Sequence, residues 1–247
     1  MIKKRIIPIL QFKNNLAIKT KQFDKQRNLG NLLQYVKVFS KRQSDEMSII
    51  NLSKNEIDNT VYDFDFLKGI VSECNMPLSV GGGIRDLNII ERLLELGCDK
   101  IVIGNNFIKN KNFIKKIVKS FGSQLIIASI DVIKKEDKFK VFLNNELELN
   151  DWIKEIQDFG AGEILLTAVH NEGMMNGYDI ELLDFVYNSI YVPILLNGGA
   201  SKISDFEAAL SIDKVYGACA SSIFLFSEIT PNLIKKNISK KINLRIT

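Results

Sequence analysis

Eight short runs rich in apolar and β-branched residues recur along this chain, and patterns typical of amphipathic helices separate them. Most runs are apolar throughout rather than at every second residue, which indicates strands buried on both faces of a parallel sheet. Eight such units in 247 residues predict one α/β domain, residues 1–247, folded as a (β/α)8 TIM barrel. A doubly wound open sheet is the alternative. The predicted strands are residues 5–11, 46–52, 77–81, 100–105, 125–131, 163–169, 193–197 and 214–220.

The two halves of the chain resemble each other. The strand that ends at Gln11 corresponds to the strand that ends at Asp131, and one glycine pair, Gly82-Gly83, corresponds to another, Gly198-Gly199. The offset between the halves is roughly 115–120 residues in both cases. The sequence therefore predicts a barrel with a half-barrel internal repeat.

Each glycine pair follows an apolar run directly and precedes a helical pattern, as residues 203–210 do after the second pair. A strand that ends in glycines leaves backbone amides open to an anion, although a tight strand-to-helix turn is the alternative for a single pair. Two copies predict a ligand with two phosphates. A third turn, Ala220-Ser221-Ser222, offers amides and hydroxyls to a phosphate before a predicted helix, and close packing of helix on strand is its alternative.

Side chains at the carboxyl ends of barrel strands carry the chemistry in folds of this kind. Asp131 closes a buried strand and is a candidate general acid or base, with capping of the next turn as the alternative. His170, the only histidine, is expected to be a solvated loop residue, with a catalytic group or a substrate contact as the alternatives. Residues 21–30 predict a mobile active-site loop, and residues 132–148 predict a small hairpin. The same end of the barrel should also hold Gln11, Asn51, Gly104, Asn105 and Thr167.

The composition excludes several classes of function. A formal charge of +4, from 33 basic and 29 acidic residues, is too small for a nucleic-acid footprint but suits a phosphorylated small molecule. The three cysteines encode neither a disulfide framework nor a zinc site, and we expect no metal or cofactor. Neither a Ser-His-Asp set nor a dinucleotide fingerprint can be assembled. The cysteine usage leads us to expect a reducing, cytoplasmic setting. The sequence also predicts no signal peptide and no membrane span of about 18 apolar residues.

These motifs together resemble the cyclase subunit of imidazole glycerol phosphate synthase, a barrel enzyme of histidine biosynthesis that uses ammonia from a separate glutaminase subunit. The resemblance covers nearly the whole chain. It implies that the three turns bind the two phosphates of a ribulosyl-formimino aminoimidazole carboxamide nucleotide, and that Lys19 and Gly177 lie near this substrate. The most specific stretches are residues 4–8 (KRIIP), 80–86 (VGGGIRD), 160–167 (GAGEILLT), 176–179 (NGYD) and 221–224 (SSIF).

The chain departs from the family pattern at the acid–base pair. The family has an aspartate at the ends of strands one and five, whereas this chain has Gln11 and Asp131. Asn51 replaces a further aspartate, and residues 170–172 (HNE) replace acidic residues that flank a basic one. Glutamine cannot transfer a proton, and such a group contributes typically about 10²–10⁴ in rate. Three functions stay open: the histidine cyclase, a paralogue that converts a sugar acetamido group to an acetamidino group for surface polysaccharides, and an inactive barrel that activates a glutaminase allosterically.

Four charged residues stand at the starts of strands one, two, four and six: Arg5, Glu46, Lys100 and Glu163. A closed barrel would bring them together at its floor, and solvated charges of little individual worth are the alternative. The resemblance implies that they form the gate of an ammonia passage. It also implies that Asp99 faces the partner, a class I glutamine amidotransferase, in a heterodimer.

Overall fold

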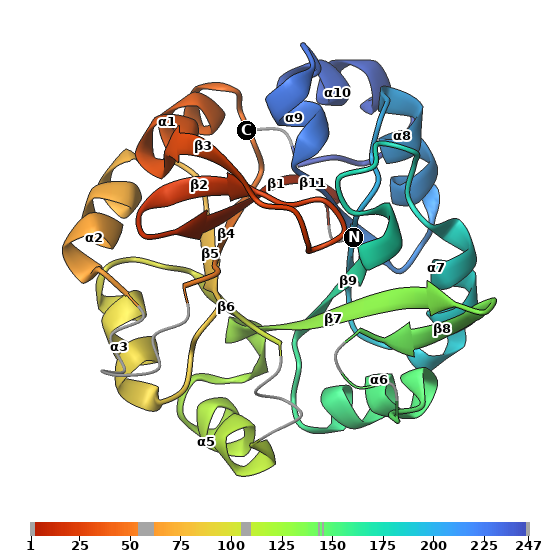
Figure 1. Cartoon of the computed structure of the whole chain (residues 1–247), viewed down its shortest axis with the longest axis horizontal. Coiled ribbons are helices and arrows are strands. Elements are labelled where there is room, and N and C mark those ends of the chain that lie inside the picture. Colours follow the sequence, from red (N-terminus) through yellow and green to blue (C-terminus); the bar gives the residue numbers. More distant parts are fainter. Residues whose placement is uncertain (1–2, 54–61, 105–109, 143, 145, 246–247) are drawn as a thin grey trace.

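The computed structural model describes residues 3–53, 62–104, 110–142, 144 and 146–245. In that part of the chain, eight parallel strands close into a barrel surrounded by helices (Figure 1). The pairing of β11 with β1 closes the ring, so the TIM-barrel prediction is confirmed. In ring order the barrel strands are β1 (Arg5–Lys13), β4 (Met47–Asn51), β5 (Leu78–Gly81), β6 (Lys100–Ile103), β7 (Ile126–Lys135), β9 (Glu163–Ala168), β10 (Ile194–Asn197) and β11 (Val215–Ala220).

Most of the described α-helices begin at a side chain that accepts a hydrogen bond from an exposed backbone amide. Asp86 accepts a hydrogen bond from Ile89 N at 3.0 Å, and Asp179 accepts one from Leu182 N at 2.9 Å. No helix of the described residues is long and apolar enough to cross a membrane. The helices are α1 (Leu32–Lys41), α2 (Phe64–Glu73), α3 (Leu87–Glu95), α5 (Lys111–Phe121), α6 (Leu149–Asp158), α7 (Ile180–Val186), α8 (Ile203–Ser211), α9 (Ser222–Phe226) and α10 (Pro231–Ile238).

Two antiparallel hairpins extend from opposite sides of the barrel. β1 pairs with β2 (Leu16–Lys19), and β7 pairs with β8 (Lys138–Val141). The second hairpin lies where the sequence predicted one. β2 also pairs with β3 (Arg27–Asn31), so residues 27–30 of the segment predicted as a mobile active-site loop belong to a strand. Because β1 and β7 begin the two halves of the chain, the hairpins extend the half-barrel repeat beyond the glycine turns.

Apolar side chains form two layers. The larger layer lies between the strands and the helices, and the smaller one fills the inside of the barrel. Side chains along β4 alternate between the two layers: Met47 and Ile49 belong to the outer layer, while Ile50 packs against the inner one. The inner layer therefore separates the two ends of the barrel. It consists of Ile7, Ile9, Val102, Ile127, Leu165, Leu195 and Cys219.

Candidate active site

A cavity of about 660 Å³ opens at the carboxyl ends of the barrel strands. All eight barrel strands, or the turns directly after them, contribute to its wall, as the sequence pattern predicted. Gly177 lies behind the wall, where its N–H donates to Gly199 O at 2.8 Å, and Asn105 lies outside the described residues. The predicted residues that line the cavity are Gln11, Lys19, Asn51, Gly82, Gly83, Gly104, Asp131, Thr167, Gly198, Gly199, Ala220, Ser221 and Ser222.

The order of the strands arranges these residues along two crossed diameters. β1 and β7 lie opposite each other in the ring, so Gln11 faces Asp131 across the cavity. β5 and β10 also lie opposite each other, a quarter turn away, and carry the two glycine turns. A ligand that reaches from one glycine turn to the other must therefore pass between Gln11 and Asp131.

Asp131 is suited to proton transfer near neutral pH. Burial raises the pKa of its carboxyl to about 6, hydrogen bonds from the Ser129 and Thr167 hydroxyls oppose that rise, and the negative charge of Glu172 adds to it. Thr167 also accepts a hydrogen bond from Asn197 Nδ2 at 3.2 Å, which holds its hydroxyl in place. A carboxyl with such a pKa can act as a base above pH 6 and as an acid below it.

Gln11 is held in one orientation by Thr20, a buried residue at the end of the first hairpin. Thr20 Oγ1 donates to Gln11 Oε1 at 2.8 Å. Because the carbonyl oxygen is bound there, the Nε2 amide is left to donate hydrogen bonds, and it cannot accept a proton. The residue opposite Asp131 therefore binds and orients but does not titrate.

The two glycine turns require glycine for close backbone contact. Gly82 has φ +86°, and a Cβ at this position would lie 2.0 Å from Asn51 O. Gly199 has φ +101°, and a Cβ there would lie 2.0 Å from Gly177 O. No side chain can replace either hydrogen without moving the backbone.

Two buried tyrosines support the first glycine turn and the third turn. The Tyr62 hydroxyl donates to the carbonyl oxygens of Gly81, at 3.0 Å, and Gly82. The Tyr178 hydroxyl donates to Cys219 O at 3.0 Å, next to the third turn. Sequence reasoning missed both roles. The only signal was a Tyr-Asp pair directly before a helix in each half of the chain, Tyr62-Asp63 and Tyr178-Asp179.

A buried ion pair joins the first hairpin to the loop after β9. Lys19 pairs with Glu172, and both side chains line the cavity. Glu172 Oε2 also accepts a hydrogen bond from Phe23 N at 3.2 Å. The Phe23 and Phe142 rings contact each other edge to face, with 5.8 Å between their centroids. Phe142 directly follows β8 and its N–H donates to Asp131 O at 2.8 Å, so the segment between β2 and β3 meets the second hairpin beside the cavity. Glu172 was not among the predicted site residues.

His170 is not the solvated residue that the sequence suggested. Its side chain is only 22% exposed, Nδ1 accepts from Lys134 N at 3.3 Å, and Nε2 lies 2.6 Å from Asp179 Oδ2. These contacts assign the ring proton to Nε2 in the neutral tautomer. The histidine fixes the second hairpin to the start of α7 and does not line the cavity.

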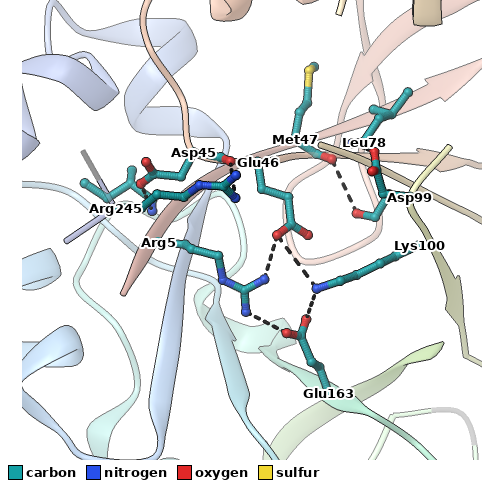
Figure 2. Close-up of polar contacts among 11 residues, drawn as sticks. Arg5, Asp45, Glu46, Met47, Leu78, Asp99, Lys100, Glu163 and Arg245 are labelled. Carbon is teal, nitrogen blue, oxygen red and sulfur yellow. Dashed lines mark hydrogen bonds and ion pairs between the residues drawn. The ribbon is translucent and has the colours of Figure 1, made fainter. Parts of the chain in front are cut away.

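The four charged residues at the strand starts meet at the opposite end of the barrel (Figure 2). Arg5 binds Glu46 at 2.6 Å and Glu163 at 2.7 Å, while Lys100 binds Glu163 at 2.9 Å and lies 3.9 Å from Glu46. The Glu46 side chain is 3% exposed and that of Arg5 10%, so these are not solvated strand-end charges. We call Arg5, Glu46, Lys100 and Glu163 the charged ring.

Asp99 lies beside the charged ring but does not belong to it. Its carboxylate accepts from Leu78 N at 2.8 Å, and the residue is exposed at the floor of the barrel (Figure 2). The structure thus places a fixed, accessible carboxylate on the face opposite the cavity.

Comparisons with known proteins agree with this architecture. The model of the family described as histidine biosynthesis protein matches residues 5–230. A Campylobacter jejuni protein, provisionally named imidazole glycerol phosphate synthase subunit hisF2, is 38% identical over 98% of this chain and 97% of its own length. The imidazole glycerol phosphate synthase subunits HisF of Phocaeicola vulgatus and Bacteroides thetaiotaomicron are 33% and 34% identical, over 100% and 93% of both chains respectively. The chain therefore belongs to the histidine biosynthesis protein family, among relatives named as the HisF subunit of imidazole glycerol phosphate synthase.

Proposed function

We propose that this chain is a cyclase-type synthase subunit that takes ammonia from a glutaminase partner. The substrate is the bisphosphorylated ribulosyl-formimino aminoimidazole carboxamide nucleotide, and the products are imidazole glycerol phosphate and an aminoimidazole carboxamide ribonucleotide (AICAR). The observation that carries the proposal is that the line between the two glycine turns crosses the line between Gln11 and Asp131. The two glycine turns stand opposite each other, and Asp131, the titratable member of the Gln11–Asp131 pair, lies on the diameter that crosses between them.

Each group of residues in the cavity has a separate role. The turns at Gly82-Gly83 and Gly198-Gly199, with Ser221 and Ser222, bind the phosphate ends of the ligand through amides and hydroxyls. Asp131 removes or supplies the proton that ring closure requires. Lys19, paired with Glu172, adds positive charge next to an anionic ligand.

The glutaminase is proposed to dock on the floor of the barrel. The charged ring and the exposed Asp99 lie there, on the face opposite the cavity. Ammonia would enter at the ring and cross the inner layer to reach the reacting carbon. Delivery from that side leaves the mouth of the cavity to the phosphorylated substrate.

Gln11 favours a second candidate. A paralogue that converts a sugar acetamido group to an acetamidino group would keep the ammonia entry and Asp131 but use a different acceptor. The non-titrating side chain opposite Asp131 fits such a change, because only one carboxyl remains on that diameter.

One series of assays separates these functions. The purified chain is supplied with the bisphosphorylated nucleotide and ammonium chloride, and then with glutamine and the glutaminase. Turnover by the wild type that is lost in Asp131→Asn supports the cyclase. Turnover of an acetamido sugar alone supports the paralogue, and stimulated glutaminase activity without consumption of either acceptor identifies an inactive activator.

A further inference from the structure

The inside of the barrel between the charged ring and the cavity is polar on one wall only. Ser48 on β4 and Ser79 on β5 both point inward and are direct neighbours in the register of the two strands. Ser79 is in turn the neighbour of Lys100, a member of the charged ring. Ser48 is 4% exposed and Ser79 is 1% exposed. Hydroxyl groups therefore continue inward from the ring along the β4–β5 wall.

The facing wall offers no comparable groups. It is formed by the inner-layer side chains of Ile127, Leu165 and Leu195, with Cys219 beside them. Burial raises the pKa of the Cys219 thiol well above its ordinary value, so this group stays protonated and neutral. A molecule at this level can form strong hydrogen bonds only on the serine side.

A small cavity of about 10 Å³ lies against the serines, and Glu46 also lines it. Within the described residues Ser48 Oγ has no hydrogen-bond partner, although it is fully buried. Ser79 Oγ has only a long bond to Met47 O, at 3.4 Å. A space of about 10–15 Å³ can hold one water molecule where polar partners are present, and a buried hydroxyl without a partner is unfavourable.

We propose that Ser48 and Ser79 form an internal binding site for one neutral molecule of the size of water. Water and ammonia share the required chemistry, because each is small, uncharged and able both to donate and to accept a hydrogen bond. The site holds water at rest and ammonia in transit from the charged ring to the cavity. Its use by ammonia rests on the proposed function, whereas the binding site itself does not.

The stability of Ser48→Ala tests whether the site is filled. If Ser48 binds a resident molecule, removal of the hydroxyl loses a hydrogen bond, and Tm should fall by about 2–4 °C. If the hydroxyl is truly without a partner, its removal is favourable and Tm should rise, which would overturn the proposal. Ser44→Ala is the matched control, because Ser44 is equally buried and its hydroxyl donates to Phe39 O at 3.3 Å.

Crystal structures of the wild type and Ser48→Val give a direct view. The wild type should show density within hydrogen-bond distance of Ser48 Oγ, and the valine methyl groups should displace it. Featureless density at this position in a well-ordered wild-type barrel would overturn the proposal, whatever the substrate is.

The transit step is tested by activity ratios. Ser48→Val should reduce glutamine-dependent turnover of the bisphosphorylated nucleotide several-fold more than turnover with ammonium chloride, which can enter through the mouth. Equal effects on the two activities would restrict the site to resident water and overturn its role in transit. A wild type without turnover of this nucleotide would instead count against the proposed function, since the Tm and density measurements do not use the nucleotide.

Discussion

At the scale of single residues, Asp131 is the clearest case of a side chain that costs stability. Burial raises the pKa of Asp131 to about 6, above the value of about 3.9 for an unfolded chain. Between pH 4 and pH 6 the folded protein therefore binds a proton that the unfolded chain has lost. The free energy of unfolding falls as pH rises through this window, and the cost is fully present at pH 7.

Asp131→Asn should accordingly stabilise the protein at neutral pH while it removes turnover. One pKa unit corresponds to about 1.4 kcal/mol, so a gain on the order of 1–3 kcal/mol is expected at pH 7, with allowance for partial exposure. The gain should disappear near pH 3.5, where both states of the wild type are protonated. Urea unfolding of the two proteins at both pH values measures this, and equal stability at pH 7 would contradict a buried carboxylate.

A substitution at Gln11 is expected to increase activity, in contrast to the loss expected for Asp131→Asn. If the site descends from an ordinary cyclase, Gln11→Asp should raise cyclase turnover, because it restores a titratable group opposite Asp131, and such a group contributes about 10²–10⁴ in rate. Gln11→Asn is the control, since asparagine has the same length as aspartate but cannot transfer a proton. No gain in the aspartate variant would mean that the pocket has been rebuilt around another acceptor.

At the scale of elements, the third turn is the best place to test the binding of phosphate. Ser221 lines the cavity at the junction of β11 and α9. Ser221→Asp should weaken the affinity for the bisphosphorylated nucleotide at least tenfold, because it puts a like charge where hydrogen bonds to a charged group contribute about 1.5–3 kcal/mol. Calorimetric titration measures the affinity. Ser211→Asp, with the same charge on the exposed end of α8, should bind as the wild type does.

The glycine turns themselves are less suitable for such a test. A substitution such as Gly82→Val forces a Cβ against Asn51 O, so loss of binding would not distinguish a blocked phosphate site from a displaced strand. The two turns are therefore better tested through their polar neighbours.

The elements also show what sequence alone can predict. The barrel strands could be located because burial on both faces leaves a continuous apolar run, as in β9. β3 could not, because Arg27–Asn31 is largely exposed and is held by backbone hydrogen bonds to β2, which need no apolar pattern. The pairing of Lys19 with Glu172 could not be predicted from the sequence either. The two residues are far apart in the sequence, and each is buried only because the other neutralises it.

At the scale of the whole molecule, the charged ring closes one end of the barrel, and Asp131 lines the cavity at the other end. Lys100→Met should reduce glutamine-dependent turnover more than turnover with ammonium chloride, if ammonia enters at the ring. Equal losses, in a variant that still folds and still binds the glutaminase, would mean that no gated passage crosses this floor.

Burial of the ring adds a prediction for stability. Arg5→Met should destabilise the fold by about 3–5 kcal/mol, because it leaves the buried carboxylate of Glu46 with Lys100 at 3.9 Å as its remaining partner in the ring. Lys100→Met should cost less, since the Lys100 side chain is 22% exposed. Chemical unfolding of the two variants compares them, and equal small losses would mean that water screens the whole ring.

The positions of the charges, of the glycine turns and of Asp131 followed from the strand pattern, because a closed barrel fixes which strand ends meet. The supporting contacts did not follow. Thr20 on Gln11 and Tyr62 on Gly82 depend on how the loops return to the barrel, and a hydrophobic pattern carries no information on that path.

Phe23 N donates to Glu172 in the loop after β9, and Phe142 N donates to Asp131 O on β7, so the contact between the two rings lies on the β7–β9 side of the cavity. The segment between β2 and β3 is therefore joined to the second hairpin beside the cavity, which Phe23 lines. We expect a contact between two such segments at the edge of the cavity to act on the rate of ligand exchange more than on equilibrium affinity. Truncation of Phe142 would then speed both entry and release, and product release would cease to limit the catalytic cycle wherever it is the slow step.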